Sequence, residues 1–244
     1  MTSIESEKLL EKLLENIDFQ ESKNYKLIVL TGLLGDFDSF EYAIALSKYL
    51  KSENCIKNLD IYFVAIGNKS GAKKFCTFTG FPKNRIRIVN DNRLHNLIGA
   101  HKGLDTGLGG WINMLLMLCG IGSPKTIPEV LRGYLGDKNA RQIYQGEDDI
   151  NLFNLIKFSG KLFENTFGNG YLRPMELATF RLRNMIEIIK NWNDYMINSK
   201  FLPQRSSTFL LDQENNVLFS YFSKSVLNYS NNMKFPLNFL SRIK

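Results

Sequence analysis

The sequence predicts an α/β fold with a mixed central sheet flanked by helices, and with a large helical insertion before a C-terminal β-hairpin. Two observations favour it. Strand and helix patterns alternate between residues 27 and 98, which implies right-handed crossovers between parallel neighbouring strands. Strand patterns then return only at residues 208–211 and 217–222, where an intervening turn-forming stretch indicates a hairpin that adds antiparallel strands.

The alternation begins at residues 27–30, an unbroken apolar run typical of a strand buried on both faces. Gly32 and Gly35 interrupt the run, and a helix pattern follows. We expect Asp38 to be the N-cap of this helix, with Glu41 completing a capping box. A loop between a strand and a helix N-terminus presents backbone N–H groups that favour an anion or a thiolate. Any chemistry is therefore expected at this loop.

The following elements repeat the pattern. Residues 59–67 predict a second buried strand, and residues 70–79 predict a helix that Gly80 ends. Residues 85–89 alternate basic and apolar side chains, which indicates a third strand, and residues 92–98 form a short helix pattern.

The expected insertion covers about residues 103–200. Its glycine-rich start has no preceding strand and no Gly-Lys-Ser/Thr, so a flexible entry is favoured over a phosphate loop. Helix patterns occupy residues 111–121, 124–134, 151–163 and 174–197. The first of these is apolar throughout and is expected to be buried. We also expect parts of the insertion to lie close over residues 36–39 and 206–208, leaving a narrow pocket there.

Composition limits the classes of protein. The chain has 244 residues, 44% of them apolar, which is enough for one elaborated domain. Residues 1–20 form an amphipathic helix pattern with acids among the leucines, unlike a signal peptide, and no apolar run reaches the roughly 20 residues that span a bilayer. A cytoplasmic protein is expected. The net charge of +7 is scattered, so nucleic-acid binding is not expected, whereas the N-terminal helix or the insertion could contact a protein partner.

Beyond these patterns, several stretches resemble a known family. GLLGDFDSFEYA, KKFCTFTGFP with RIRIVNDNRLHNLIG, WINMLLMLCGIGSPKTIPEVLRGYLGD, RPMELATFRLRNMIEIIKNW and RSSTFLLDQENNVLFSYF are similar to the peroxiredoxin-like branch of the AhpC/TSA superfamily found in cyanobacteria and plastids. The resemblance implies a thioredoxin-like domain over residues 21–244 and an antioxidant or redox-linked role. It implies an active-site region made of Asp36, Phe37, Asp38, Ser39, Arg205, Ser206, Ser207 and Thr208.

The sequence departs from that family at the decisive position. Redox-active members carry a cysteine in the loop before the first helix, and here Asp36-Phe37-Asp38-Ser39 occupies it. Ser207 stands where thioredoxins have a cis-proline. These departures favour a redox-linked binding or regulatory role over thiol exchange at the loop.

Three interpretations of Asp36, Asp38 and Ser39 in this loop remain. As caps, Asp36 and Asp38 would satisfy helix N–H groups. As an Asp-x-Asp pair they would serve metal-dependent phosphoryl transfer, although their distance from the strand end does not match such loops. As a nucleophile, Ser39 would need a base, and neither His95 nor His101 is a strong candidate.

The three cysteines have no zinc or disulfide spacing. Cys76 lies in a family-like motif and is the candidate catalytic residue of a one-cysteine thiol peroxidase, with Lys73 one turn away to favour its thiolate. A packed, inert thiol is the alternative. Cys119 lies in an apolar run and is expected to be buried, and Cys55 follows a helix. No cofactor is expected.

Overall fold

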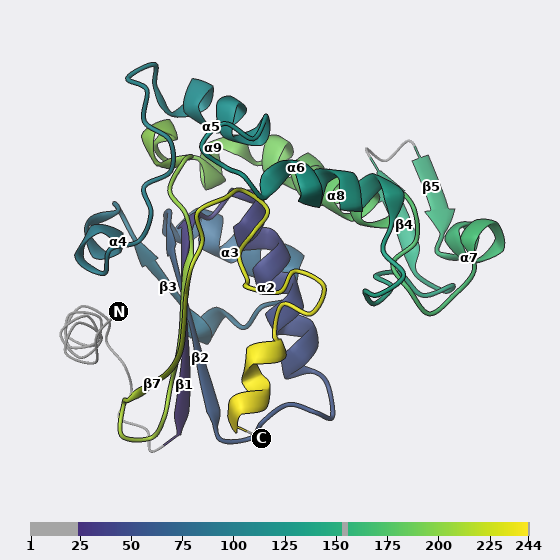
Figure 1. The fold of residues 1–244 in the computed structure, drawn as a ribbon, viewed down its shortest axis with the longest axis horizontal. Coiled ribbons are helices and arrows are strands. Elements are labelled where there is room, and N and C mark those ends of the chain that lie inside the picture. The colour runs from purple at the N-terminus through teal and green to yellow at the C-terminus, as the bar shows by residue number, and fades with distance from the viewer. Residues whose placement is uncertain (1–23, 153–155, 244) are drawn as a thin grey trace.

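A five-stranded mixed sheet forms the centre of the protein (Figure 1). The computed structural model describes residues 24–152 and 156–243. The sheet has the order β3-β2-β1-β6-β7, in which β1 to β3 run parallel and β6 and β7 run antiparallel to their neighbours. The predicted α/β fold with a mixed central sheet flanked by helices is therefore confirmed, and its topology is compatible with a thioredoxin-like arrangement.

The parallel half follows the alternation in the sequence. β1 (Tyr25–Leu33) is the middle strand, and β2 (Leu59–Ile66) and β3 (Ile86–Val89) lie successively outward from it. The crossovers contain α2 (Phe37–Leu50) and α3 (Lys69–Thr79), and the latter ends at Gly80 in the left-handed conformation with φ of 71°. The short elements η1 (Lys83–Arg85) and α4 (Arg93–Leu97) flank β3.

Alternate side chains of β1 enter two cores. Leu27 and Val29 pack with residues of α2, α3 and the C-terminal segment on one face. Ile28 and Leu30 pack on the other face with residues of α4. Burial on both faces explains why this strand is an apolar run without polar alternation.

The C-terminal hairpin is also as predicted. β6 (Ser207–Leu211) and β7 (Val217–Phe222) pair across a turn in which Asn215 has φ of 68°. The chain then returns over the α2 face of the sheet and ends in η3 (Asn238–Ile243) (Figure 1).

The expected insertion, about residues 103–200, is less helical than expected. The helices in its described residues are α5 (Gly110–Leu118), α6 (Thr126–Leu135), α7 (Lys161–Phe167), α8 (Glu176–Lys190), α9 (Trp192–Tyr195) and η2 (Ser199–Phe201). The helix expected over residues 151–163 is wrong, because β4 (Asp149–Leu152) and β5 (Ile156–Ser159) form an antiparallel pair there. This pair and α7 project beyond the far end of α8 (Figure 1).

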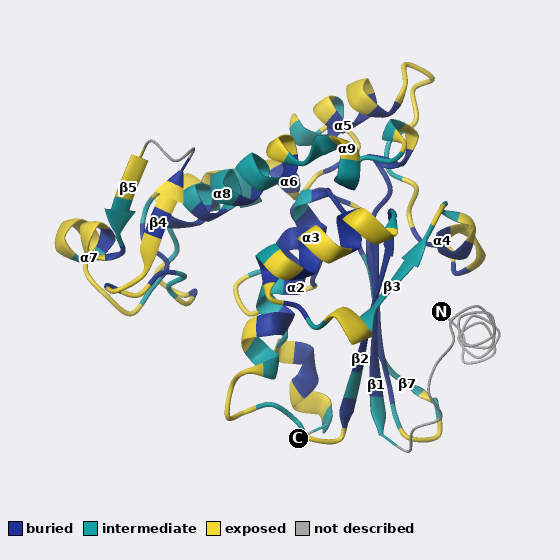
Figure 2. Cartoon of the chain, turned by 180° about the vertical axis from the view of Figure 1, so that it is seen from behind, coloured by how far each residue is buried: buried dark blue, intermediate teal, exposed yellow. Residues whose placement is uncertain are grey.

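Burial corrects two further expectations. The helix expected to be buried is α5, yet Trp111 and Leu115 are 48% and 57% exposed. Figure 2 shows exposed stretches along this helix. Cys119, which follows α5, is also exposed. The amphipathic helix predicted for residues 1–20 lies outside the described residues. Within the described part of the chain, no helix is both long and apolar enough to cross a membrane.

Candidate functional site

The loop expected to carry chemistry connects β1 to α2. An added Cβ at Gly32 would lie 2.5 Å from the carbonyl oxygen of Gln204, and one at Gly35 would lie 2.8 Å from the side chains of Tyr195 and Met196. These two glycines therefore allow other segments to approach the loop closely. Ser39 Oγ donates a 2.8 Å hydrogen bond back to the carbonyl oxygen of Leu33.

The capping prediction for this loop is wrong. Asp36, not Asp38, is the N-cap residue of α2, and its side chain makes no capping hydrogen bond. Asp38 lies within the first turn, and Glu41 pairs with Arg181 of α8 rather than with the helix start. Because distant arginines offer these carboxylates stronger charge-assisted contacts, tertiary partners replace the local cap.

Arg205 holds the two aspartates from the segment that precedes β6. Its Nη1 donates to Asp38 Oδ2 at 3.2 Å, and its Nη2 lies 3.6 Å from Asp36 Oδ2. The guanidinium also donates to the carbonyl oxygens of Pro203 and Leu202, both at 2.7 Å. Asp36, Asp38 and Arg205, which we call the Arg205 cluster, are all at most 1% exposed.

Burial governs the ionisation of this cluster. It raises the pKa of Asp36 and raises the pKa of Asp38 well above its usual range, while Arg205 opposes both shifts. The charge of Asp36 adds to the upward shift at Asp38. One guanidinium thus faces two desolvated carboxyl groups, so the cluster favours a proton on Asp38.

The other predicted loop residues close around the cluster. Ser206 and Ser207 are buried, and their hydroxyl groups have no hydrogen-bond partner among the described residues. Thr208 Oγ1 lies 3.0 Å from the hydroxyl of Tyr42, whose pKa is raised by burial. The structure therefore brings the β1–α2 loop and residues 205–208 together, as a sealed polar interior.

A second network of charged side chains, which are buried or partly buried, lies one turn further along α2. Arg181 Nε lies 2.5 Å from Glu41 Oε1, and its Nη1 donates to the carbonyl oxygen of Glu129. Glu129 in turn pairs with Arg132 at 2.8 Å. Sequence analysis missed this network. Its signal is the position of Arg181 on the same helical face as the buried residues Leu177, Asn184 and Ile188.

Arg205 lies within 3.6 Å of one oxygen of each aspartate, whereas Asp36 Oδ1 and Asp38 Oδ1 have no hydrogen-bond partner among the described residues. No cluster of three or more His, Cys, Asp or Glu side chains that could hold a metal ion occurs in the described part of the chain. The Ser39 hydroxyl is engaged by a backbone carbonyl. His95 is buried with its Nε2 2.7 Å from the Thr31 carbonyl oxygen, and burial lowers the pKa of this histidine to about 4.

The three cysteine thiols lie outside the β1–α2 loop. Cys76 is 4% exposed in the core between α3 and the sheet, and burial raises the pKa of its thiol. Cys55 is half-buried and Cys119 is exposed, and neither belongs to the β1–α2 loop. This burial agrees with the interpretation of Cys76 as a packed, inert thiol.

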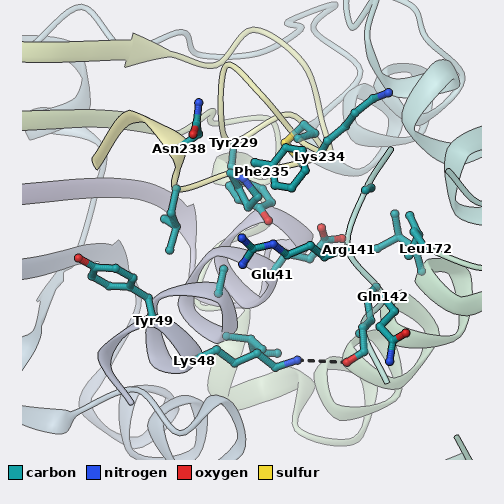
Figure 3. A pocket seen from close by; sticks show the side chains of 18 of the residues that line it. Glu41, Lys48, Tyr49, Arg141, Gln142, Leu172, Tyr229, Lys234, Phe235 and Asn238 are labelled. Atoms are coloured by element: carbon teal, nitrogen blue, oxygen red, sulfur yellow. Dashed lines mark hydrogen bonds between the residues drawn. The ribbon is translucent and has the colours of Figure 1, made fainter. Parts of the chain in front are cut away.

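Two pockets flank the charged networks. The larger, about 540 Å³, lies beside α2 and is lined also by residues 140–143 and 233–238; we call it the α2 pocket (Figure 3). The smaller, about 280 Å³, is lined by Phe37 together with residues of α6 and α8. Asp36, Asp38 and Ser39 line neither of these two pockets and are each at most 1% exposed, and the narrow pocket expected over them stays a prediction. Residues of the expected insertion do lie against the loop, at Gly35 and Phe37.

Comparison with models of known protein families, with curated proteins and with solved structures finds no match to this chain.

Proposed function

We propose that this chain is a binding or regulatory protein of thioredoxin-like architecture that does not use thiol chemistry. The observation that carries the proposal is the Arg205 cluster, which places one buried guanidinium against two buried carboxyl groups at the strand-to-helix loop. In the proteins that the sequence resembles, that loop holds an accessible cysteine. A thiolate there must meet a peroxide or a disulfide, and a sealed ion pair gives neither access nor a nucleophile.

The sheet order supports the architectural part of the proposal. β1, α2 and β2 followed by the β6–β7 hairpin and a closing helical turn have the connectivity of a thioredoxin-like core. In this interpretation residues 103–200 are an insertion between the two halves. The redox-linked character of the role rests on the resemblance of the sequence to peroxiredoxin-like proteins.

The environment of Cys76 argues against the alternative of a one-cysteine peroxidase. A peroxidatic cysteine needs a low pKa and an open path to solvent, whereas the Cys76 thiol is buried and its pKa is raised. Lys73, which would favour a thiolate, lies on the solvent side of α3.

Peroxide consumption with thioredoxin as the reductant tests the proposal. We expect consumption no faster than that of the same assay without the protein, and no change in Cys76→Ser. Cys119→Ser serves as the matched control because Cys119 is the exposed thiol. Rapid turnover that disappears in Cys76→Ser and persists in Cys119→Ser would overturn the binding role and establish the peroxidase.

A further inference from the structure

We propose that the α2 pocket binds a small organic anion with a flat apolar body. Its volume of about 540 Å³ lies within the range of about 300–1,000 Å³ typical of small-molecule sites. The proposal goes beyond the function proposed above and does not rest on it, because the pocket is separate from the Arg205 cluster and from all three thiols.

The base of the pocket is apolar and partly aromatic. Its buried lining includes Leu172, Leu177, Phe180, Tyr229 and Leu240, each at most 8% exposed. Phe235 lines the pocket with 37% of its surface exposed. A ligand with a flat hydrocarbon body would remove this surface from water, and its rings could pack against Tyr229 or Phe180.

The charged part of the lining is predominantly positive. Lys48, Arg132, Arg141 and Lys234 face one acid, Glu41. Three of these five charges are already paired: Glu41 with Arg181, Arg132 with Glu129, and Lys234 with Asp137. The remaining two, Lys48 and Arg141, have no carboxylate partner among the described residues.

Lys48 and Arg141 are therefore the groups that an anion would meet. The Lys48 amine lies 3.4 Å from the carbonyl oxygen of Ile143, shown by the dashed line in Figure 3. The guanidinium of Arg141 lies over the ring of Phe235, 5.7 Å from its centroid. Lys48 is an exposed residue, yet partial desolvation lowers the pKa of its amine, a shift that the charge of Asp148 opposes. A nearby anion would therefore stabilise the charged form of the amine.

Buried contacts hold the segment that carries Arg141. Glu176 Oε1 accepts hydrogen bonds from the backbone N–H groups of Ile143 and Tyr144, at 2.9 and 2.8 Å. The same carboxylate pairs with Arg173 at 2.7 Å, and both side chains are fully buried. In the lining segment 233–238, the carbonyl oxygen of Met233 accepts a hydrogen bond from Arg132. The pocket is thus preformed, which lowers the entropic cost of binding.

Three naphthalene compounds with the same ring system test the ligand class by titration calorimetry on the full chain. We expect 2-naphthoate to bind with one site per chain, and the neutral 2-naphthamide to bind about fivefold more weakly. The cationic 2-naphthylmethylammonium should be weaker still. Failure of 2-naphthoate to bind, or equal affinity for the acid and the amide, would overturn the proposal.

Variants then locate the site. Lys48→Gln and Arg141→Gln should each weaken 2-naphthoate binding about fivefold and leave 2-naphthamide binding unchanged. Lys73→Gln is the matched control, because Lys73 is an exposed helical lysine that does not line the pocket. It should bind as the wild type does. An equal loss in Lys73→Gln would show that only net charge matters and would overturn the assignment.

A third variant tests the cavity without changing charge. Ala45 lines the pocket from α2, so Ala45→Phe should fill the space and abolish binding of both the acid and the amide. A circular dichroism spectrum and an unfolding midpoint close to those of the wild type would establish that the variant folds. Wild-type affinity in a folded Ala45→Phe would exclude this pocket as the site, and the two charge variants decide the question if Ala45→Phe does not fold.

Discussion

The two ends of α2 have opposite relations to solvent. At its N-terminal end, Arg205 closes over Asp36 and Asp38, and every charged atom of that cluster is buried. Towards its C-terminal end, Lys48 and the facing Arg141 stand at the rim of an open pocket, and neither has a carboxylate partner in the part of the chain that the structure describes. The helix end that is usually associated with chemistry is closed in this protein, and the opposite half is accessible. Charge at the first position is therefore structural, whereas charge at the second is available for recognition.

Among the changes that test this contrast between the two ends of α2, removing Arg205 should have the largest effect on stability. Arg205→Met would leave two buried carboxyl groups without their cation, and we expect a loss of about 3–5 kcal/mol in the free energy of unfolding. Urea denaturation at neutral pH measures it. Adding Asp36→Asn and Asp38→Asn to the same chain should recover part of the loss, because the uncompensated charges are removed. A loss below about 1 kcal/mol would mean that the cluster is not sealed.

The ionisation of Asp38 should have an intermediate effect on the free energy of unfolding. Its folded-state pKa stands well above the ordinary value of 3.8, so the folded protein binds this proton more tightly than the unfolded chain does. The stability that this proton contributes is complete below the ordinary pKa and is lost as pH rises through the folded-state pKa.

Comparison with Asp38→Asn isolates this contribution, because asparagine does not titrate. The unfolding free energy of the wild type minus that of Asp38→Asn should fall as pH rises from about 4 to about 8. Urea denaturation across this series measures the difference. A difference that rises with pH would indicate that Arg205, and not burial, dominates the ionisation of Asp38.

Removing the rim cations should have the smallest effect on stability. Lys48→Gln and Arg141→Gln should each change the free energy of unfolding by less than about 0.5 kcal/mol, because exposed charges without a carboxylate partner contribute little. The same urea series measures both. A destabilisation comparable to that of Arg205→Met would place these residues in the structural framework and remove the contrast between the two ends of α2.

Local patterns in the sequence determined most of the sheet. The apolar run at residues 27–30, the helix patterns on either side of residues 59–67 and the turn before residue 217 each encode one element through neighbouring side chains, and all of these elements form. Periodicity and turn-forming residues act over a few neighbouring positions, so they can be recognised in the sequence without knowledge of the tertiary structure. The β4–β5 pair was missed because the apolar residues between positions 150 and 158 recur at helical as well as at strand spacing, and no glycine or proline separates the two strands.

Partners distant in sequence were decided by the tertiary structure alone. Asp38 has the local sequence pattern of an N-cap, but its carboxylate instead accepts a hydrogen bond in the interior from Arg205, 167 positions away. The apolar run at α5 has the composition of a core helix, yet Leu115 is 57% exposed, and Trp111, although stacked on Trp192, is 48% exposed. Burial and ion pairing depend on which surfaces the chain brings together. A side chain's type therefore limits its possible partners, and only the packed fold selects among them.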